Sequence, residues 1–275
     1  MTIIVITTIL SAVLGLRTTE MEAPADRCLA LVLKGGANKG SYEAGAIYTL
    51  VRNLPAKEVQ YQVVSGISVG ALNAAHVASY PVGEELNMSE ELINLWTNMR
   101  TENLYRKWNW GIMEGLFEHQ GLYDSSPLYE FVQDYFLNRT LHRLIHINSV
   151  DAITGDVVTF DENDWKEDFL LGLCGSAAVP FVFPPVVYKD KLLMDGGVAW
   201  SLDISSAIAR CREIVDSDSK IVLDIIDLDK NLAGVPPSWN ETGNSLSNFM
   251  RFRKIRDYYQ SADNEFEAQW AFPDV

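Results

Sequence analysis

The residues of this chain best suited to nucleophilic chemistry are grouped around Ser68. This serine lies between Gly66 and Gly70 in a G-x-S-x-G pattern. The apolar run 61–65 before it predicts a short buried strand, and the small residues of 69–80 predict a helix. A serine at such a turn presents its hydroxyl at the positive end of a helix dipole, and the glycines give the turn steric room. An acyl-transfer nucleophile needs this arrangement.

A serine nucleophile also needs a base, and the histidines do not supply an evident one. In Ser-Asp-His hydrolases with this elbow, the order along the chain is serine, acid, histidine. This chain has 4 histidines, and none follows residue 146. We interpret all of them as ordinary core or surface residues: His76, His119, His142 and His146. The base is therefore expected to be a carboxylate.

Asp195 is the best candidate for this base. The apolar run 186–194 predicts a strand that ends at Asp195, and Gly196 and Gly197 follow it. The two glycines permit a tight turn and the close approach of another backbone. An isolated Asp-Gly-Gly usually marks only a turn, so the prediction depends on the other motifs of the chain.

One of these motifs is the glycine-rich loop 35–40, between a predicted strand at 28–33 and a predicted helix at 41–54. Backbone N–H groups converge in such a loop, where an anion can bind. Two nucleotide-binding motifs are excluded. Ala37 replaces the second glycine of G-x-G-x-x-G, and the lysine of a P-loop would have to follow Gly40, where this chain has a serine.

We therefore interpret this loop as a cradle for the oxyanion of a tetrahedral intermediate. Its candidate residues are Gly35, Gly36 and Ala37, with Lys39 as a nearby positive charge.

The order and spacing of these motifs resemble those of the patatin-like phospholipases. The matching segments are the loop 35–40, the elbow 66–70 and the acid turn 195–197, and the stretches 121–128 and 175–186 agree as well. The resemblance implies a Ser-Asp dyad without histidine, in which Ser68 is the nucleophile and Asp195 the general base. We expect no metal and no cofactor.

The resemblance further implies a lipid acyl hydrolase that cleaves carboxylic esters of phospholipids or related glycerolipids. The chain departs from the family pattern at Ala37, where a third glycine is usual, and at Lys39, where arginine is usual. Alanine keeps the backbone donor but adopts a positive φ only at a steric cost. The alternative is a catalytically weak or silent patatin-like protein with a storage or lipid-binding role.

The predicted elements favour an α/β fold with a mostly parallel central sheet and helices on both faces, a patatin-like three-layer arrangement. We expect strands at 28–33, 61–65, 143–150, 156–160, 186–194 and 220–226, and helices at 41–54, 69–80, 89–99, 126–137 and 203–213. Residues 25–275 are expected to form one domain, since no linker or repeat divides them.

The N-terminal segment is treated separately. Residues 3–16 are apolar, too few for a comfortable membrane span, so we expect residues 1–20 to be a signal peptide or another apolar leader. The segment has no lysine or arginine before this run, which leaves a membrane-associating stretch as the alternative. Three sequons, at Asn87, Asn138 and Asn240, are compatible with a secreted or endomembrane-lumen protein.

The 3 cysteines are too few for a disulfide framework, and we interpret each as a buried structural residue. They are Cys28, Cys174 and Cys211, and their odd number leaves at least one thiol unpaired.

The net charge of −15 excludes nucleic acid as a partner and disfavours strongly anionic membranes. A lipid surface would have to be met by apolar contact, for which the aromatic-rich stretch 105–123 is the candidate, with a role in the core as the alternative. Protein partners are not indicated. Asp224, Asp227 and Asp229 are interpreted as a solvated strand end rather than a metal site.

Overall fold

A central sheet organises the computed structural model, which describes residues 4–5, 27–164, 166–228, 247–248, 251–253, 255–256, 259, 266 and 269–275. Its strand order is β1-β8-β2-β3-β4-β7-β6, and β5 pairs with β4 outside this order. The strands are β1 (Ile4–Val5), β2 (Cys28–Leu33), β3 (Val63–Gly66), β4 (Leu144–Asp151), β5 (Val157–Phe160), β6 (Val186–Tyr188), β7 (Lys191–Asp195) and β8 (Ile221–Ile226).

The sheet is parallel from β1 to β4 and antiparallel where β5, β6 and β7 join it. β2 is central in the parallel part, and all six of its residues are buried. A parallel strand covered on both faces requires such a continuous apolar run.

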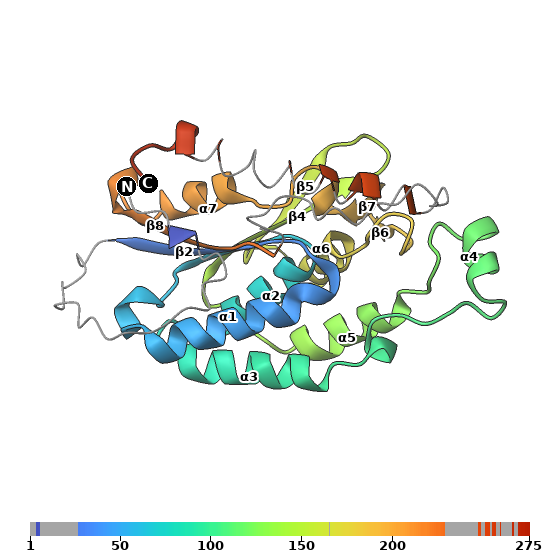
Figure 1. The fold of residues 1–275 in the computed structure, drawn as a ribbon, viewed down its shortest axis with the longest axis horizontal. Helices are drawn as coiled ribbons and strands as arrows, with labels where there is room; N and C mark the ends of the chain where they lie inside the picture. Colours follow the sequence, from blue (N-terminus) through green and yellow to red (C-terminus); the bar gives the residue numbers. More distant parts are fainter. Residues whose placement is uncertain are drawn as a thin grey trace.

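Helices cover both faces of the sheet, as Figure 1 shows. The helices are α1 (Gly40–Asn53), α2 (Val69–Ala78), α3 (Glu85–Asn98), α4 (Ile112–Phe117), α5 (Ser126–Phe136), α6 (Lys166–Ser176) and α7 (Ile204–Cys211). Leu29, Leu31 and Leu33 of β2 join the larger core, with α1, α2, α3, α5 and α6. The alternate β2 residues face a smaller core with α7. The fold is therefore the expected three-layer α/β arrangement.

The sequence-based elements differ from the structure in three places. The strand expected at 186–194 is a hairpin, because Lys189, with a φ of 53°, begins the turn between β6 and β7. Helix α6 was not predicted, since nearly all of its residues from Phe169 onward are buried and no polar face marks a helical period. The short helix α4 was also not predicted.

The cysteines are all buried, as predicted. The structure adds a disulfide between Cys28, at the start of β2, and Cys211, at the end of α7, with the two Cα atoms 5.6 Å apart. Cys174 is free, and burial raises the pKa of its thiol to about 12. The sequence count could not assign the pair, because the two partners are 183 residues apart.

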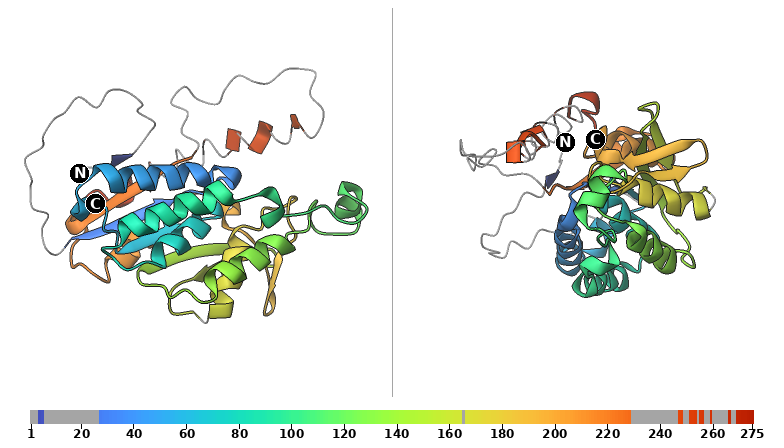
Figure 2. Two further views of the ribbon diagram at one scale, coloured as in Figure 1. Left: turned by 90° about the horizontal axis from the view of Figure 1, so that it is seen from below. Right: turned by 90° about the vertical axis from the view of Figure 1, so that its right-hand side faces the viewer.

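Most of the predicted N-terminal leader lies outside the described residues. Of the leader predicted at 1–20, only Ile4 and Val5 lie in the described residues, where they pair with Asp224 and Ile225 of β8. Within the described ranges, no helix has the length and apolarity needed to cross a bilayer. The left view of Figure 2 shows that α4 extends away from the body of the molecule.

Candidate functional site

Ser68 lies in a sharp turn between β3, which ends at Gly66, and α2, which begins at Val69. Its backbone has φ 57° and ψ −124°, a conformation that is costly for a residue with a side chain. The N–H of Ser68 donates to Ser176 Oγ at 2.9 Å, so the end of α6 helps to hold the turn. The strand–serine–helix arrangement predicted from the sequence is present.

The glycines of the elbow are needed because the turn closes on itself and on β2. A Cβ on Gly66 would lie 2.2 Å from the carbonyl oxygen of Gly70. A Cβ on Gly70 would lie 2.6 Å from the carbonyl oxygen of Leu33, the last residue of β2. Neither site accepts a side chain without a backbone shift, which explains the G-x-S-x-G pattern at this position.

The side chains of Asp195 and Ser68 are directly hydrogen-bonded. The hydroxyl of Ser68 donates to Asp195 Oδ2 at 2.6 Å, and the two residues are 5% and 6% exposed. The other carboxylate oxygen accepts from Gly197 N–H at 2.7 Å, and the N–H of Asp195 donates to the carbonyl of Ala178. Pairing of β7 with β4, where Asp195 lies opposite Ser149, brings this carboxylate to the elbow.

The glycine-rich loop lies beside the nucleophile. A Cβ on Gly35 would come within 3.2 Å of Ser68 Cβ, and one on Gly36 within 2.3 Å of Leu228 Cδ1. Ala37 has a φ of 51°, in the left-handed region that favours glycine. The structure therefore places alanine where a glycine would be relaxed, at a cost of roughly 1 kcal/mol.

Lys39 lies on the exposed part of this loop. Its Nζ donates to the carbonyl of Leu228 at 3.3 Å, which holds the loop against the segment after β8. A role of its charge toward an oxyanion stays a prediction.

A buried ion pair at the start of this loop was not foreseen from the sequence. Lys34 Nζ lies 2.9 Å from Asp227 Oδ1, with the two side chains 1% and 2% exposed. Lys34 directly precedes Gly35, so the pair ties the loop to the end of β8. The sequence signal was a lysine at the end of an apolar strand, a position where an unpaired charge would be costly.

Asp227 is therefore not part of a solvated strand end, and neither is Asp224. Asp224 Oδ2 accepts from the hydroxyl of Tyr61 at 2.5 Å, and burial raises the pKa of Asp224. The interpretation is wrong for both residues because β8 lies inside the sheet next to β2. Asp229 lies outside the described residues. Across those residues, no group of three or more histidine, cysteine or acidic side chains could hold a metal ion.

The far end of the loop is held by a second buried network that the sequence also did not indicate. Asn73 of α2 donates from Nδ2 to the carbonyl of Gly40 at 3.0 Å and to Glu43 Oε2 at 2.7 Å. Its Oδ1 accepts from Trp96 Nε1 at 2.8 Å. Burial raises the pKa of Glu43 well above its usual value. The loop is thus fixed to α2, the helix that begins after the nucleophile.

All four histidines lie in the described ranges, and none is hydrogen-bonded to Ser68. His76 is buried, with Nδ1 2.7 Å from the hydroxyl of Tyr135 and Nε2 2.9 Å from the carbonyl of Met88. His146 Nε2 lies 3.4 Å from Asp203 Oδ2. These contacts agree with the structural roles predicted for the histidines.

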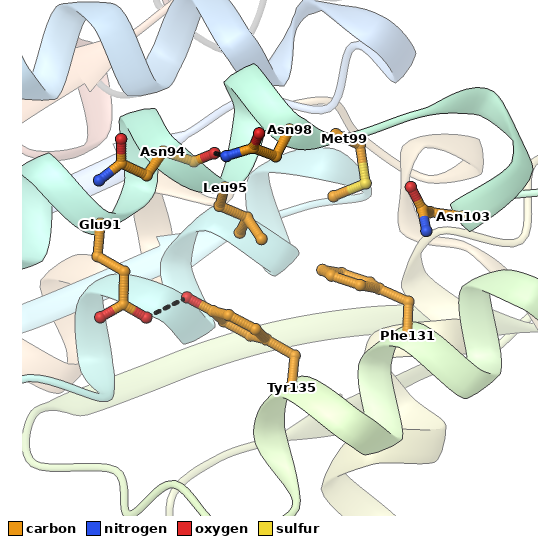
Figure 3. Close-up of a pocket in the computed structure, with 8 residues that line it drawn as sticks. All are labelled: Glu91, Asn94, Leu95, Asn98, Met99, Asn103, Phe131 and Tyr135. Carbon is orange, nitrogen blue, oxygen red and sulfur yellow. Dashed lines mark hydrogen bonds between the residues drawn. The ribbon is translucent and has the colours of Figure 1, made fainter.

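A pocket of about 350 Å³ lies elsewhere, between α3 and α5. In Figure 3, Leu95, Met99 and Phe131 face its open space, and a hydrogen bond from Tyr135 to Glu91 closes one end. Neither Ser68 nor Asp195 lines this pocket, so it is separate from the dyad.

Comparison with known proteins gives a family match and distant structural neighbours. The family model described as patatin-like phospholipase matches residues 31–208. No curated protein matches the sequence significantly. VipD from Legionella pneumophila is 10% identical with a TM-score of 0.43, and the match covers 90% of this chain and 56% of VipD. The ExoU–SpcU complex of Pseudomonas aeruginosa gives 14% identity and a TM-score of 0.35, covering 86% of this chain and 52% of the other. The chain thus spans little more than half the length of these proteins.

Proposed function

The chain belongs to the patatin-like phospholipase family, and from this membership we propose that it hydrolyses carboxylic esters of phospholipids or related glycerolipids through Ser68 and Asp195. Family membership supports lipid hydrolase activity in general. The observation that carries the finer proposal is the 2.6 Å hydrogen bond from the Ser68 hydroxyl to the nearly buried Asp195 carboxylate.

In this proposal Asp195 takes the hydroxyl proton as Ser68 Oγ attacks the ester carbonyl carbon. The tetrahedral intermediate then expels the leaving alcohol, which receives the proton from Asp195. A water molecule, deprotonated by the same carboxylate, attacks the acyl-enzyme carbonyl carbon. The bond to Ser68 Oγ then breaks, Oγ takes back the proton from Asp195, and the fatty acid is released. The bond from Gly197 N–H to the second carboxylate oxygen keeps Asp195 oriented through both steps.

The backbone N–H groups of Gly36 and Ala37 are the proposed donors to the oxyanion. The N–H of Gly35 already donates to the carbonyl of Ser201 at 3.3 Å, so Gly35 is proposed to shape the loop beside Ser68. Two observations support this role of the loop. The loop lies close to Ser68, since a Cβ on Gly35 would come within 3.2 Å of Ser68 Cβ, and two buried networks fix the ends of the loop. Loss of one such donor typically lowers turnover about a hundredfold to a thousandfold.

A serine-reactive fluorophosphonate probe tests this proposal together with hydrolysis of phospholipid, galactolipid and triacylglycerol substrates. We expect labelling and hydrolysis by the wild type, neither by Ser68→Ala, and a loss of turnover by orders of magnitude in Asp195→Asn. His142→Asn, which changes an exposed histidine, is the matched control and should retain turnover. Hydrolysis near the wild-type rate by folded Ser68→Ala protein would exclude the dyad.

A catalytically weak or silent patatin-like protein with a storage or lipid-binding role is the second candidate. The observation in its favour is the strained backbone of Ala37 in the proposed cradle. This candidate predicts lipid binding by the wild type without probe labelling at Ser68.

For location, we propose a secreted or endomembrane-lumen protein, with a membrane-associated protein as the alternative. The Cys28–Cys211 disulfide supports an oxidising compartment, and Asn138 is exposed just after α5, where a glycan could be attached. Asn87 lies within α3, and Asn240 lies outside the described residues. A glycosidase-sensitive mass shift that disappears in Asn138→Gln would test the proposal.

A further inference from the structure

Residues 105–123 form an extension around α4, here called the α4 arm. The backbones of Arg106 and Asp124 pair at its base through two hydrogen bonds of 3.0 Å, and Arg106 Nε donates to Asp124 Oδ2. Figure 1 and the left view of Figure 2 show the arm beyond the end of the sheet, away from the other helices. It is thus a closed loop that projects from the body.

The arm has a defined internal structure. The ring of Trp108 stacks on His119 with centroids 3.7 Å apart, and its Nε1 donates to the carbonyl of Gly121 at 3.1 Å. A Cβ on Gly115 would lie 2.6 Å from the carbonyl oxygen of Leu122, so α4 packs closely on the returning chain. These contacts hold the arm in one shape without help from the main core.

The outer surface of the arm is apolar. Trp110 is 85% exposed, Phe117 74% and Met113 62%, and Ile112 and Leu116 are exposed as well. The carboxylate of Glu114 is turned inward, where it accepts from Trp110 N–H at 2.6 Å and contacts His119 Nε2. The arm therefore uses one of its two acids, Glu114, internally, while Glu118 is exposed beside the large apolar side chains. Exposed apolar side chains gathered in this way are expected of a binding surface.

The charge of the arm differs from that of the chain. Arg106 and Lys107 balance Glu114 and Glu118 within 105–123, whereas the whole chain has a net charge of −15. A strongly anionic surface would repel the rest of the molecule. A neutral, zwitterionic lipid surface would bind the arm without this electrostatic repulsion. Tryptophan and phenylalanine are suited to the interface of such a surface.

The arm is also continuous with the candidate site. At its base, Leu122 N–H donates to the carbonyl of Phe181 and Tyr123 N–H to that of Val182, both at 3.0 Å. Phe181 and Val182 belong to the segment 178–182, which begins with Ala178. The carbonyl of Ala178 accepts from Asp195 N–H at 3.0 Å. A surface bound by the arm would thus be held at the segment that contacts the dyad.

We propose that the α4 arm binds zwitterionic lipid surfaces by inserting Trp110, Met113 and Phe117 into the interface, and so holds the dyad against its substrate. This inference rests on the proposed lipid hydrolase function. It assigns to the arm the role of the lipid-contacting element.

Vesicle binding tests the arm separately from catalysis. Full-length Ser68→Ala protein, which cannot turn over lipid under the proposed mechanism, is mixed with phosphatidylcholine vesicles and sedimented. We expect binding that falls by about tenfold or more in Trp110→Ser/Phe117→Ser, since two large apolar contacts are lost. Ile153→Ser/Val82→Ser removes exposed apolar side chains outside the arm and is the matched control, expected to bind normally. Vesicles containing about one third phosphatidylglycerol should bind more weakly.

Hydrolysis measurements separate this inference from the proposed function. In otherwise wild-type protein, Trp110→Ser/Phe117→Ser should lose hydrolysis of phosphatidylcholine vesicles but keep kcat/KM for a water-soluble butyrate ester. If neither substrate is cleaved by the wild type, the proposed function fails, while vesicle binding still decides on the arm. Circular dichroism and the single variants Met113→Ser and Phe117→Ser guard against misfolding of the double variant.

Two results would overturn the inference. One is vesicle binding that is absent in the wild type or unchanged in Trp110→Ser/Phe117→Ser. The other is a wild-type dimer that dissociates in this variant without any vesicle binding, because the arm would then contact a second copy of the chain.

Discussion

Ala37, a proposed backbone donor to the oxyanion, has a φ of 51°. Replacement by glycine relieves the contact between Cβ and the backbone, although glycine also gains entropy in the unfolded chain. We expect Ala37→Gly to raise the free energy of unfolding by up to about 1 kcal/mol and not to lower kcat. Denaturant unfolding and steady-state kinetics measure both. Ala56→Gly, in an exposed 3₁₀ turn without a positive φ, should instead be destabilising. If Ala37→Gly lowers the free energy of unfolding, the backbone of Ala37 is not strained.

His76 is predicted to make stability depend on pH. Burial lowers the pKa of His76 from 6.5 to about 4, so the unfolded chain binds a proton first as pH falls. Its contribution is therefore fully present above pH 6.5 and is lost as pH falls toward 4. Thermal unfolding of His76→Gln should show a smaller loss of Tm between pH 7 and pH 4.5 than the wild type. Equal losses would show that His76 is not held neutral.

At the scale of elements, the loop between β2 and α1 is held at both ends. Lys34 anchors its start to Asp227 after β8, and Asn73 anchors Gly40 to α2. Parallel pairing of β2 with β8, in which Leu33 lies opposite Ile226, brings Lys34 next to Asp227.

Lys34→Met should therefore affect both stability and turnover. Removing one partner of a buried ion pair typically costs about 3–5 kcal/mol, whereas replacing both partners by apolar residues can be neutral. We expect the double variant Lys34→Met/Asp227→Leu to recover most of the stability lost in Lys34→Met. Turnover should stay low in both, with KM less affected, if the loop stabilises the transition state as proposed. Denaturant unfolding with kinetics on a soluble ester tests this; wild-type kcat in the double variant would rule out a positioning role.

The parts of the site that were predictable are those marked by local sequence. Ser68 and Asp195 each lie in a short glycine-flanked motif, and β2 was predicted with its observed bounds because its apolar run is buried on both faces. The Lys34–Asp227 pair joins residues 193 positions apart, and only the strand order reveals it. Helix α6, which supplies Ser176 to the elbow, has no amphipathic period from which it could be recognised.

For the whole molecule, the Cys28–Cys211 disulfide links the start of β2 to the end of α7. Removal of a native disulfide typically costs about 2–5 kcal/mol, chiefly by releasing the unfolded chain. We expect a reductant, or Cys28→Ser/Cys211→Ser, to lower Tm while the dyad still cleaves a soluble ester at room temperature. Cys174→Ala should remain sensitive to the reductant, because its thiol is not part of the bond. A Tm independent of reductant would show that the bond does not stabilise the fold.

The disulfide also determines what a single break in the backbone would do. Ser68 and Asp195 both lie between Cys28 and Cys211 in the sequence, on opposite sides of the α4 arm. A protease that cut the exposed arm would divide the chain into one fragment with Ser68 and another with Asp195, the proposed nucleophile and base. The two fragments would stay covalently attached through sulfur, so a nicked molecule could keep its two catalytic halves together and would separate only on a reducing gel.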